Sequence, residues 1–211
     1  MNSPLFIFDL DGTLIDSRAD LTAAINHMRT SFGLDELPLE TVSGFIGNGA
    51  RKLVERAVSD AQVDVDEAFE RNKEYYLSHL TVHTTCYPGV QEGIKALAER
   101  GCKMAVLTNK PGASSRIILD HFGLSPYLVT TIGGGDISAL KPDPAGAFRC
   151  IELADASKEN CWMVGDHYTD LSVAKNAGIQ SIFARYGFGE MRGFKPTQSI
   201  DSFSELLNFV D

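Results

Sequence analysis

The apolar and polar positions of the chain follow three different patterns from one end to the other. A short apolar run, Leu5–Phe8, predicts a buried strand near the N-terminus. Between residues 15 and 83, apolar residues recur at helical spacing, and no stretch there is typical of a good strand. From Pro88 onward, short apolar runs alternate with amphipathic stretches. This last pattern predicts strands that alternate with helices.

The patterns also predict where individual elements lie. In the helical stretch, Ser17 and Asp20 have the spacing of a capping box, which would begin a helix that ends near Gly33. Three more helices are expected there, at residues 39–45, 50–59 and 65–80. Further along we expect strands at 103–108, 127–132, 161–164 and 179–184, and helices at 90–100, 114–122, 144–153, 169–176 and 203–210.

This order of elements predicts the fold class. Parallel strands need crossover connections, so alternating strands and helices favour an α/β fold with a Rossmann-like parallel sheet covered on both faces. Residues 1–14 and 84–211 would form this core, and residues 15–83 would be an all-α insertion.

Two carboxylates follow the first strand. Asp9 and Asp11 alternate by two, so both side chains face the same side, and Gly12 lets the chain turn away. Adjacent carboxylates repel unless a cation or a shared proton offsets the repulsion. Mg²⁺ takes oxygen ligands and is commonly held by one or two carboxylates plus a phosphate. The alternative is an ordinary Asp-Gly turn at the end of a strand.

Other polar groups follow later apolar runs. They are Thr108, Asn109, Lys141, Asp166 and Asp170. In open parallel sheets, ligands bind beyond the carboxyl ends of the strands. We therefore expect Asp9, Thr108 and Asp166 to share one site.

Composition and charge exclude several classes of function. The 211 residues are 44% hydrophobic and carry a net charge of −9, and no basic stripe is present to meet nucleic-acid phosphates. No apolar stretch reaches the ~18 residues of a membrane span, and no secretion signal is evident, so we expect a cytoplasmic protein. The four cysteines are scattered and lack the paired spacing of a zinc site.

The ordered motifs resemble those of the haloacid dehalogenase superfamily, whose members are mostly phosphatases. The matching pieces are the stretch 9–13, Thr108, Lys141 and the stretch 165–170. The resemblance implies a magnesium-dependent phosphomonoester hydrolase that acts on a small phosphorylated metabolite. Dehalogenases of the superfamily lack an acid at the position of Asp11 and need no metal, so dehalogenation is not expected.

The resemblance also implies a role for each matching residue. Asp9 would be the nucleophile that carries the phosphoryl group as an aspartyl-phosphate, and Asp11 the general acid. Lys141 would place a positive charge against Asp9 and the phosphoryl group. Gly12, Thr108 and Asn109 would donate hydrogen bonds to the phosphoryl oxygens. The metal would be bound by Asp9, Asp166 and the main-chain carbonyl of Asp11.

The helical insertion is similar to the cap of superfamily members that carry a helical bundle in this place. Within it, Gly47-Asn48-Gly49 precedes a helix, as in the cap of phosphoglycolate phosphatases. Exposed N–H groups at this turn, together with Arg51, would bind an anion, which makes 2-phosphoglycolate the expected substrate, with Asn48 and Arg51 as contacts. The alternative is a plain turn between helices.

The sequence leaves alternatives open for the activity and for the roles of three residues. The same motifs occur in sugar-phosphate phosphatases and phosphomutases, a pyrophosphatase is possible, and a silent binding protein is a further alternative. Lys110 is either a substrate contact or a solvated lysine, and His167 either touches substrate or is a polar loop residue. Asp170 either orients Lys141 or a metal-bound water, or favours the helix dipole. The protein would be a monomer or a homodimer.

Overall fold

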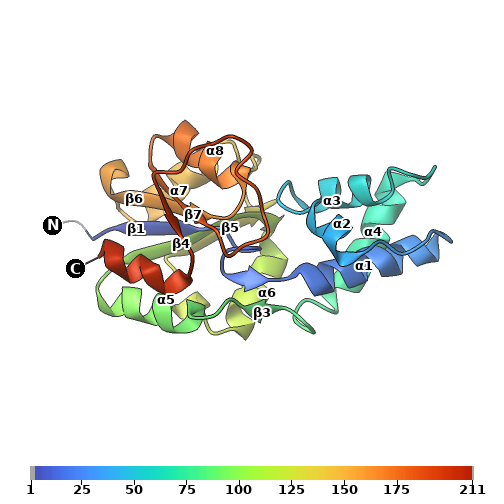
Figure 1. The fold of residues 1–211 in the computed structure, drawn as a ribbon, viewed down its shortest axis with the longest axis horizontal. Helices are drawn as coiled ribbons and strands as arrows, with labels where there is room; N and C mark the ends of the chain where they lie inside the picture. The colour runs from blue at the N-terminus through green and yellow to red at the C-terminus, as the bar shows by residue number, and fades with distance from the viewer. Residues whose placement is uncertain (1–2, 211) are drawn as a thin grey trace.

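The structure, a computed structural model, describes residues 3–210. Its main sheet has six parallel strands in the order β5-β4-β1-β6-β7-β8 (Figure 1). The strands are β1 (Leu5–Phe8), β4 (Lys103–Pro111), β5 (Thr130–Gly134), β6 (Cys161–Gly165), β7 (Gln180–Ala184) and β8 (Gln198–Ile200). The predicted α/β fold is confirmed.

Helices cover both faces of this sheet. One face packs against α5 (Val90–Glu99), α6 (Gly112–His121) and the 3-10 helix η3 (Phe203–Phe209), and the other against α7 (Ala145–Leu153) and α8 (Tyr168–Ala177). Two short 3-10 helices, η1 (Ser125–Tyr127) and η2 (Lys158–Asn160), lie in the connections.

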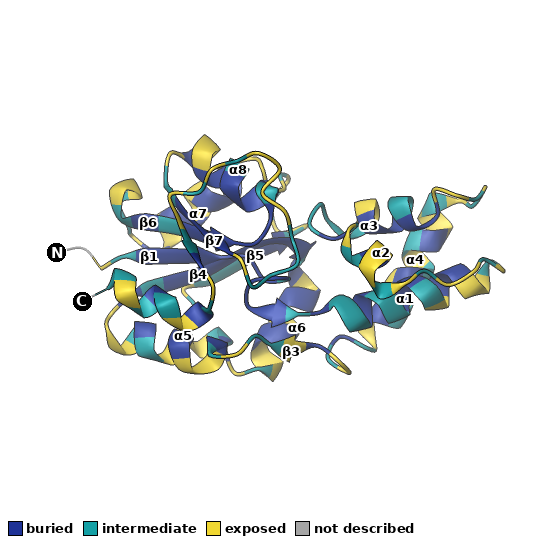
Figure 2. Ribbon diagram, in the orientation of Figure 1, coloured by how far each residue is buried: buried dark blue, intermediate teal, exposed yellow. Residues whose placement is uncertain are grey.

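The first strand shows why the chain opens with an uninterrupted apolar run. β1 lies between β4 and β6, so both of its faces are covered, and all four side chains are fully buried. Phe6 and Phe8 point to the face covered by α5, α6 and η3, whereas Leu5 and Ile7 point to the face covered by α7 and α8. Figure 2 shows the strands buried and the outer surfaces of the helices exposed.

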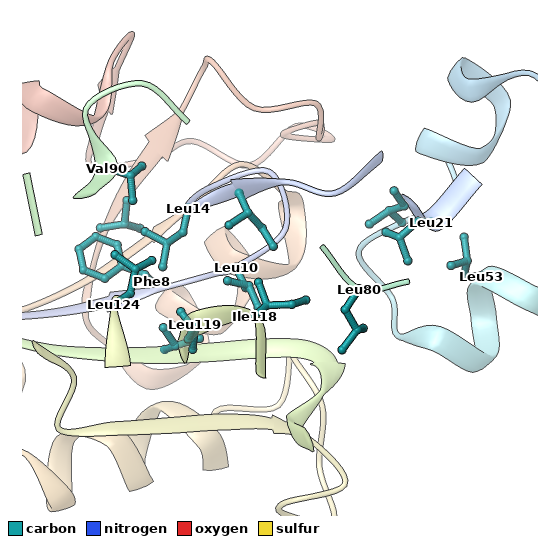
Figure 3. Packing of buried hydrophobic residues seen from close by; sticks show 14 of the residues in the cluster. Phe8, Leu10, Leu14, Leu21, Leu53, Leu80, Val90, Ile118, Leu119 and Leu124 are labelled. Carbon is teal, nitrogen blue, oxygen red and sulfur yellow. The ribbon is translucent and has the colours of Figure 1, made fainter. Parts of the chain in front are cut away.

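A second group of helices stands beyond one end of the sheet (Figure 1). It consists of α1 (Arg18–Ser31), α2 (Leu39–Ser43), α3 (Ala50–Ala57) and α4 (Val65–Leu77). One apolar cluster continues from the sheet into this group, from Phe8 through Leu10 and Leu80 to Leu21 and Leu53 (Figure 3). Within residues 3–210, no helix combines the length and the apolar character that crossing a membrane requires.

Three short strands, β2 (Ile15–Asp16), β3 (Thr85–Cys86) and β8, depart from the predictions. β2 pairs antiparallel with β3, so the expectation of no strand between residues 15 and 83 was wrong at its first two residues. Two residues are too few to show a period of two. β8 was also not predicted, and the last helix is of the 3-10 type.

The predicted capping box at the start of α1 was wrong. The Ser17 hydroxyl makes no capping bond and instead donates to Asp11 Oδ1 at 2.5 Å. The buried Asp20 carboxylate accepts hydrogen bonds from the backbone N–H groups of His83 and Thr84 and from the Thr84 hydroxyl. Ser17 bonds to a residue upstream of the helix and Asp20 to residues far along the chain, and a local spacing rule considers neither partner.

Candidate active site

Three neighbouring strands bring predicted residues to one edge of the sheet. Asp9 directly follows β1, Asp166 directly follows β6, and Thr108 lies in the second half of β4. Because these strands are parallel and adjacent, their carboxyl ends meet at the same edge. All three residues are at most 5% exposed. The expected grouping of the three is found in the structure.

A buried lysine joins two of the carboxylates. Lys141 Nζ lies 2.8 Å from Asp9 Oδ1 and 2.6 Å from Asp170 Oδ1. Burial alone would lower the pKa of Lys141, but the carboxylates of Asp170 and Asp9 outweigh it and raise that pKa. The ammonium group is therefore held in its charged form. Asp9 Oδ1 also accepts a hydrogen bond from Leu10 N at 2.7 Å, and within residues 3–210 no hydrogen bond reaches Asp9 Oδ2.

Asp166 is held by the backbone of a loop that follows β7. Its Oδ2 accepts hydrogen bonds from Phe188 N at 3.0 Å and Gly189 N at 2.8 Å, and its Oδ1 accepts one from the Thr13 hydroxyl at 3.4 Å. Gly12 has a φ of +84°, and a Cβ there would collide with the Asp166 carboxylate. Burial raises the pKa of Asp166 well above its ordinary value, and the carboxylates of Asp170 and Asp9 add to this effect.

This cluster has the chemistry of a divalent-cation site. Asp9, Asp166 and Asp170 each offer a carboxylate oxygen, and these oxygens lie within 4.8 Å of one another. All three residues are buried, and Lys141 is the one cation that the structure pairs with them among the described residues. Burial raises the pKa of Asp166, and this surplus of negative charge raises it further. A hard cation with oxygen ligands would offset it, so the residues fit Mg²⁺.

Asp170 begins α8 together with His167. The Asp170 carboxylate accepts from His167 N at 3.0 Å, and the His167 ring in turn caps Thr169 N. With its other oxygen bound to Lys141, Asp170 meets both of its expected structural roles: it orients the lysine and it stabilises the helix start. Burial lowers the pKa of His167 to about 4, so the ring is neutral near pH 7.

Asp11 faces a different lysine. Lys110 Nζ lies 3.0 Å from Asp11 Oδ1, and the lysine side chain is only 3% exposed. Burial alone would lower the pKa of Lys110, but Asp11 and Tyr76 outweigh it and raise that pKa. The solvated lysine considered from the sequence is thus not found. The signal available was the position of Lys110 at the end of an apolar run, but its partner is 99 residues away.

Thr108 and Asn109 make contacts within the protein. Thr108 Oγ1 accepts a hydrogen bond from Lys110 N. The Asn109 amide group donates to the carbonyls of Gly47 and Lys141, both at 3.0 Å, and its oxygen accepts from Lys141 N at 2.8 Å. The Asn109 side chain therefore joins the backbone of Lys141 to the inserted helices. It does not point a free donor at the site.

The glycine-rich turn of the insertion docks on the sheet domain. Gly47 has a φ of +108°, and a Cβ there would lie 2.7 Å from the His167 ring. Asn48 Nδ2 donates to Tyr168 Oη at 2.9 Å, and Asn48 Oδ1 accepts from Arg56 Nη2 at 2.7 Å. The Asn48 side chain thus links the helical insertion to the sheet domain. Arg56, which the sequence analysis did not single out, supports this turn.

Arg51 does not contact the buried residues of the site. Its side chain is 53% exposed and pairs with Asp66 at 2.7 Å and with Glu55 at 3.4 Å. Both partners lie in the inserted helices: Asp66 is near the N-terminal end of α4, and Glu55 is in the last turn of α3. The predicted anion contact of Arg51 would require it to leave these partners.

A cavity of about 820 Å³ lies between the helical insertion and the edge of the sheet. Asp9, Asp11 and Asp166 line it from the sheet side. From the insertion it is lined by residues of the glycine-rich turn, α3 and α4, among them Asn48, Leu53, Asn72 and Tyr76. The enclosed space is of the size that holds small-molecule ligands. The buried carboxylates thus open onto a pocket that a second group of helices covers.

Comparison with known proteins identifies the family. A model of haloacid dehalogenase-like hydrolases matches residues 6–184, most of the chain. The chain therefore belongs to this family, as the resemblance of its motifs indicated.

The chain is also similar to particular members. It is 34% identical to the phosphoglycolate phosphatase of Psychrobacter arcticus, over 100% of this chain and 96% of that protein. It is 38% identical to phosphoglycolate phosphatase 1 of Pseudomonas aeruginosa, over 98% and 79%. A crystal structure described as a predicted phosphoglycolate phosphatase from Haemophilus somnus superposes with a TM-score of 0.94 at 29% identity, covering 99% of this chain and 98% of that one.

Proposed function

We propose that this protein is a magnesium-dependent phosphatase that hydrolyses a small phosphate monoester through an aspartyl-phosphate. The observation that carries this proposal is the position of Asp9, which lines the cavity beside a charged lysine, a second acid and a carboxylate cluster. Residues 15–83 act as a cap that covers this site. We expect the enzyme to be cytoplasmic.

In the first step, a carboxylate oxygen of Asp9 attacks phosphorus. A P–O bond forms to Asp9, the ester P–O bond breaks, and Asp11 gives a proton to the leaving oxygen. Asp9 Oδ1 is held by Leu10 N and Lys141 Nζ, which fixes the orientation of the side chain. Its other oxygen, Oδ2, has no hydrogen-bond donor among the described residues. This oxygen is therefore available to attack phosphorus or to bind a metal.

In the second step, water attacks the phosphorus of the aspartyl-phosphate. Asp11, now a carboxylate, takes a proton from this water, the P–O bond to Asp9 breaks, and inorganic phosphate leaves. Lys110 and Ser17 both bind Asp11 Oδ1 and keep the side chain in place for both proton transfers.

The charges of the site match those of the reacting phosphoryl group. Lys141 is ionised and buried next to Asp9, where its charge acts in a medium of low dielectric. Asp9, Asp166 and the main-chain carbonyl of Asp11 would hold Mg²⁺, which neutralises charge on the phosphoryl oxygens when bound. Asp170 binds no substrate in this mechanism and positions Lys141.

We propose 2-phosphoglycolate as the substrate, since relatives at 34% and 38% identity carry the name of that activity. A screen for phosphate release tests the proposal. It should compare 2-phosphoglycolate, sugar phosphates, nucleotides and pyrophosphate, each with magnesium and with excess chelator. We expect the highest kcat/KM for 2-phosphoglycolate and no turnover in chelator. Full activity in chelator would contradict the proposed magnesium requirement. A preference for pyrophosphate would contradict the proposed class of substrate, a phosphate monoester.

A further inference from the structure

Two polar side chains on the cap side of the cavity lack hydrogen-bond partners. Asn72 and Tyr76 lie four residues apart in α4, so they share one face of the helix, and both line the cavity. They are 6% and 8% exposed. Among residues 3–210, three buried side-chain polar atoms have no partner, and two of them are Asn72 Nδ2 and the Tyr76 hydroxyl. The third, on Thr22, is outside the cavity lining.

Such unpaired groups call for an explanation. Buried polar groups are nearly always hydrogen-bonded, because leaving one unpaired costs its full desolvation. Two unpaired groups on one helix face, both at the wall of the same cavity, indicate that their partner is a molecule that enters this cavity. The cap wall around them holds apolar side chains, among them Ile46, Leu53 and Phe69, and three cations, Arg51, Lys52 and Lys73. The three cations are about half exposed and pair with acidic side chains of the insertion, whereas Asn72 and Tyr76 are buried. The position of the two buried polar groups therefore selects where a polar part of the ligand can lie.

Tyr76 lies on the leaving-group side of the reacting centre. Lys110 Nζ is 3.0 Å from Asp11 Oδ1 and also 4.8 Å from the centroid of the Tyr76 ring. The same ammonium group therefore contacts both the proposed general acid and the tyrosine. Since Asp11 protonates the leaving oxygen, the part of the substrate attached to that oxygen extends toward Tyr76 and Asn72.

The donors present define the chemistry of that part. An amide N–H and a phenol O–H both donate, and the ammonium group of Lys110 adds a positive charge beside them. A carboxylate accepts from both donors and is attracted by the charge. The two side chains previously expected to bind it are engaged elsewhere, because Asn48 bonds to Tyr168 and Arg56, and Arg51 pairs with Asp66.

We propose that Asn72 and Tyr76 form the subsite that binds the carboxylate of the substrate, with Lys110 as the adjacent positive charge. This proposal rests on the phosphatase function proposed above and specifies the part of the substrate that the cap recognises. It predicts that α4, and not the glycine-rich turn, decides between phosphate esters with and without a carboxylate one carbon from the ester oxygen.

The test compares two substrates that differ only at this position. In ethyl phosphate a methyl group replaces the carboxylate of 2-phosphoglycolate. The variants are Tyr76→Phe, which removes the hydroxyl alone, and Asn72→Leu, which keeps the volume. Each should lower kcat/KM for 2-phosphoglycolate relative to ethyl phosphate by about ten- to a hundredfold, the range for a lost hydrogen bond to a charged group. The matched control is Tyr75→Phe on the same helix, whose ring stacks between His27 and His79 away from the cavity wall.

The outcomes separate this proposal from the proposed function. Equal losses on both substrates, or a preference for 2-phosphoglycolate that persists in both variants, would overturn the subsite and leave the phosphatase standing. A wild-type enzyme that does not prefer 2-phosphoglycolate over ethyl phosphate would overturn the subsite and the substrate together. A wild-type enzyme without activity on any phosphate ester would overturn the phosphatase itself. Because the Tyr76 hydroxyl makes no hydrogen bond of good geometry and only faces the Lys110 ammonium group, Tyr76→Phe should change the thermal midpoint little, so misfolding can be recognised.

Discussion

The two sides of the cavity differ in how their buried polar groups are satisfied. On the sheet side, Lys141 is paired with Asp9 and Asp170, and Asp166 accepts three hydrogen bonds. On the cap side, Asn72 and Tyr76 carry polar atoms with no partner among residues 3–210. The sheet side is thus held in place by the protein itself, whereas the cap side has donors that await a ligand.

This difference indicates that the sheet side carries out the chemistry and the cap side recognises the substrate. Chemistry on phosphorus is the same for every ester, so its groups can be fixed permanently by their neighbours. Recognition of the organic part depends on the substrate, and it uses groups that gain their hydrogen bonds only when the correct ligand is present. A wrong ligand then leaves buried donors unpaired, which lowers its affinity.

The largest effect should come from the sheet side. Asp9→Asn keeps the shape of the side chain and an oxygen for Leu10 N and Lys141, but a neutral amide cannot attack phosphorus. We expect kcat to fall by more than about a thousandfold on every substrate. Steady-state phosphate release measures this, with Asp120→Asn, an exposed position in α6, as the control. Turnover of Asp9→Asn near the wild-type rate would exclude Asp9 as the nucleophile.

A second effect concerns the surplus of negative charge. Asp166→Asn removes one buried carboxylate and keeps an oxygen for the N–H groups of Phe188 and Gly189. Without metal, it should raise the thermal midpoint by about 2–4 °C, since relieving repulsion worth about 1 kcal/mol shifts a protein of this size by that amount.

Magnesium should stabilise the wild type and leave Asp166→Asn unchanged. At about 100 times its Kd, a ligand of the native state stabilises by about 2.7 kcal/mol, and we expect this gain for the wild type only. Thermal unfolding with chelator and with magnesium measures both effects. A wild-type midpoint that magnesium does not change would argue against a cation site at Asp9 and Asp166.

The sequence predicted the sheet side well for a physical reason. Asp9 and Asp166 directly follow buried strands and Thr108 lies in one, and parallel strands bring their ends together whatever the details of packing. The order of strands and helices therefore sufficed to place Asp9, Thr108 and Asp166 at one edge. What the sequence could not show is which partner each polar side chain selects, as with Ser17 and Asp20, whose partners lie outside the predicted helix cap.

The cap side was harder to predict because the sequence does not show which face of each inserted helix lies against the edge of the sheet. Glycine flanking Asn48 indicated a tight turn, and the turn is there, but its contacts are with Tyr168 and Asn109 of the core. Asn72 and Tyr76 stand at ordinary helical spacing among charged residues. Only the tertiary structure shows that they lie at a cavity wall without partners.

The smallest expected effect distinguishes two arginines of α3. Arg56 donates to the carbonyl of Phe45 and to Asn48, both at 2.7 Å, and so holds the turn that docks on the core. Arg56→Ala should loosen this docking and raise KM by about three- to tenfold on 2-phosphoglycolate and ethyl phosphate alike, the cost of one or two hydrogen bonds that act on cap closure.

Arg51→Ala removes only exposed ion pairs, which contribute little to stability in water, so kcat/KM should change by less than about twofold. Parallel kinetics of both variants on both substrates make the comparison. If Arg51→Ala instead lost activity on 2-phosphoglycolate alone, Arg51 would have to leave Asp66 and bind the carboxylate when substrate enters. Recognition would then come from the N-terminal end of α3, and the unpaired donors of α4 would need another explanation.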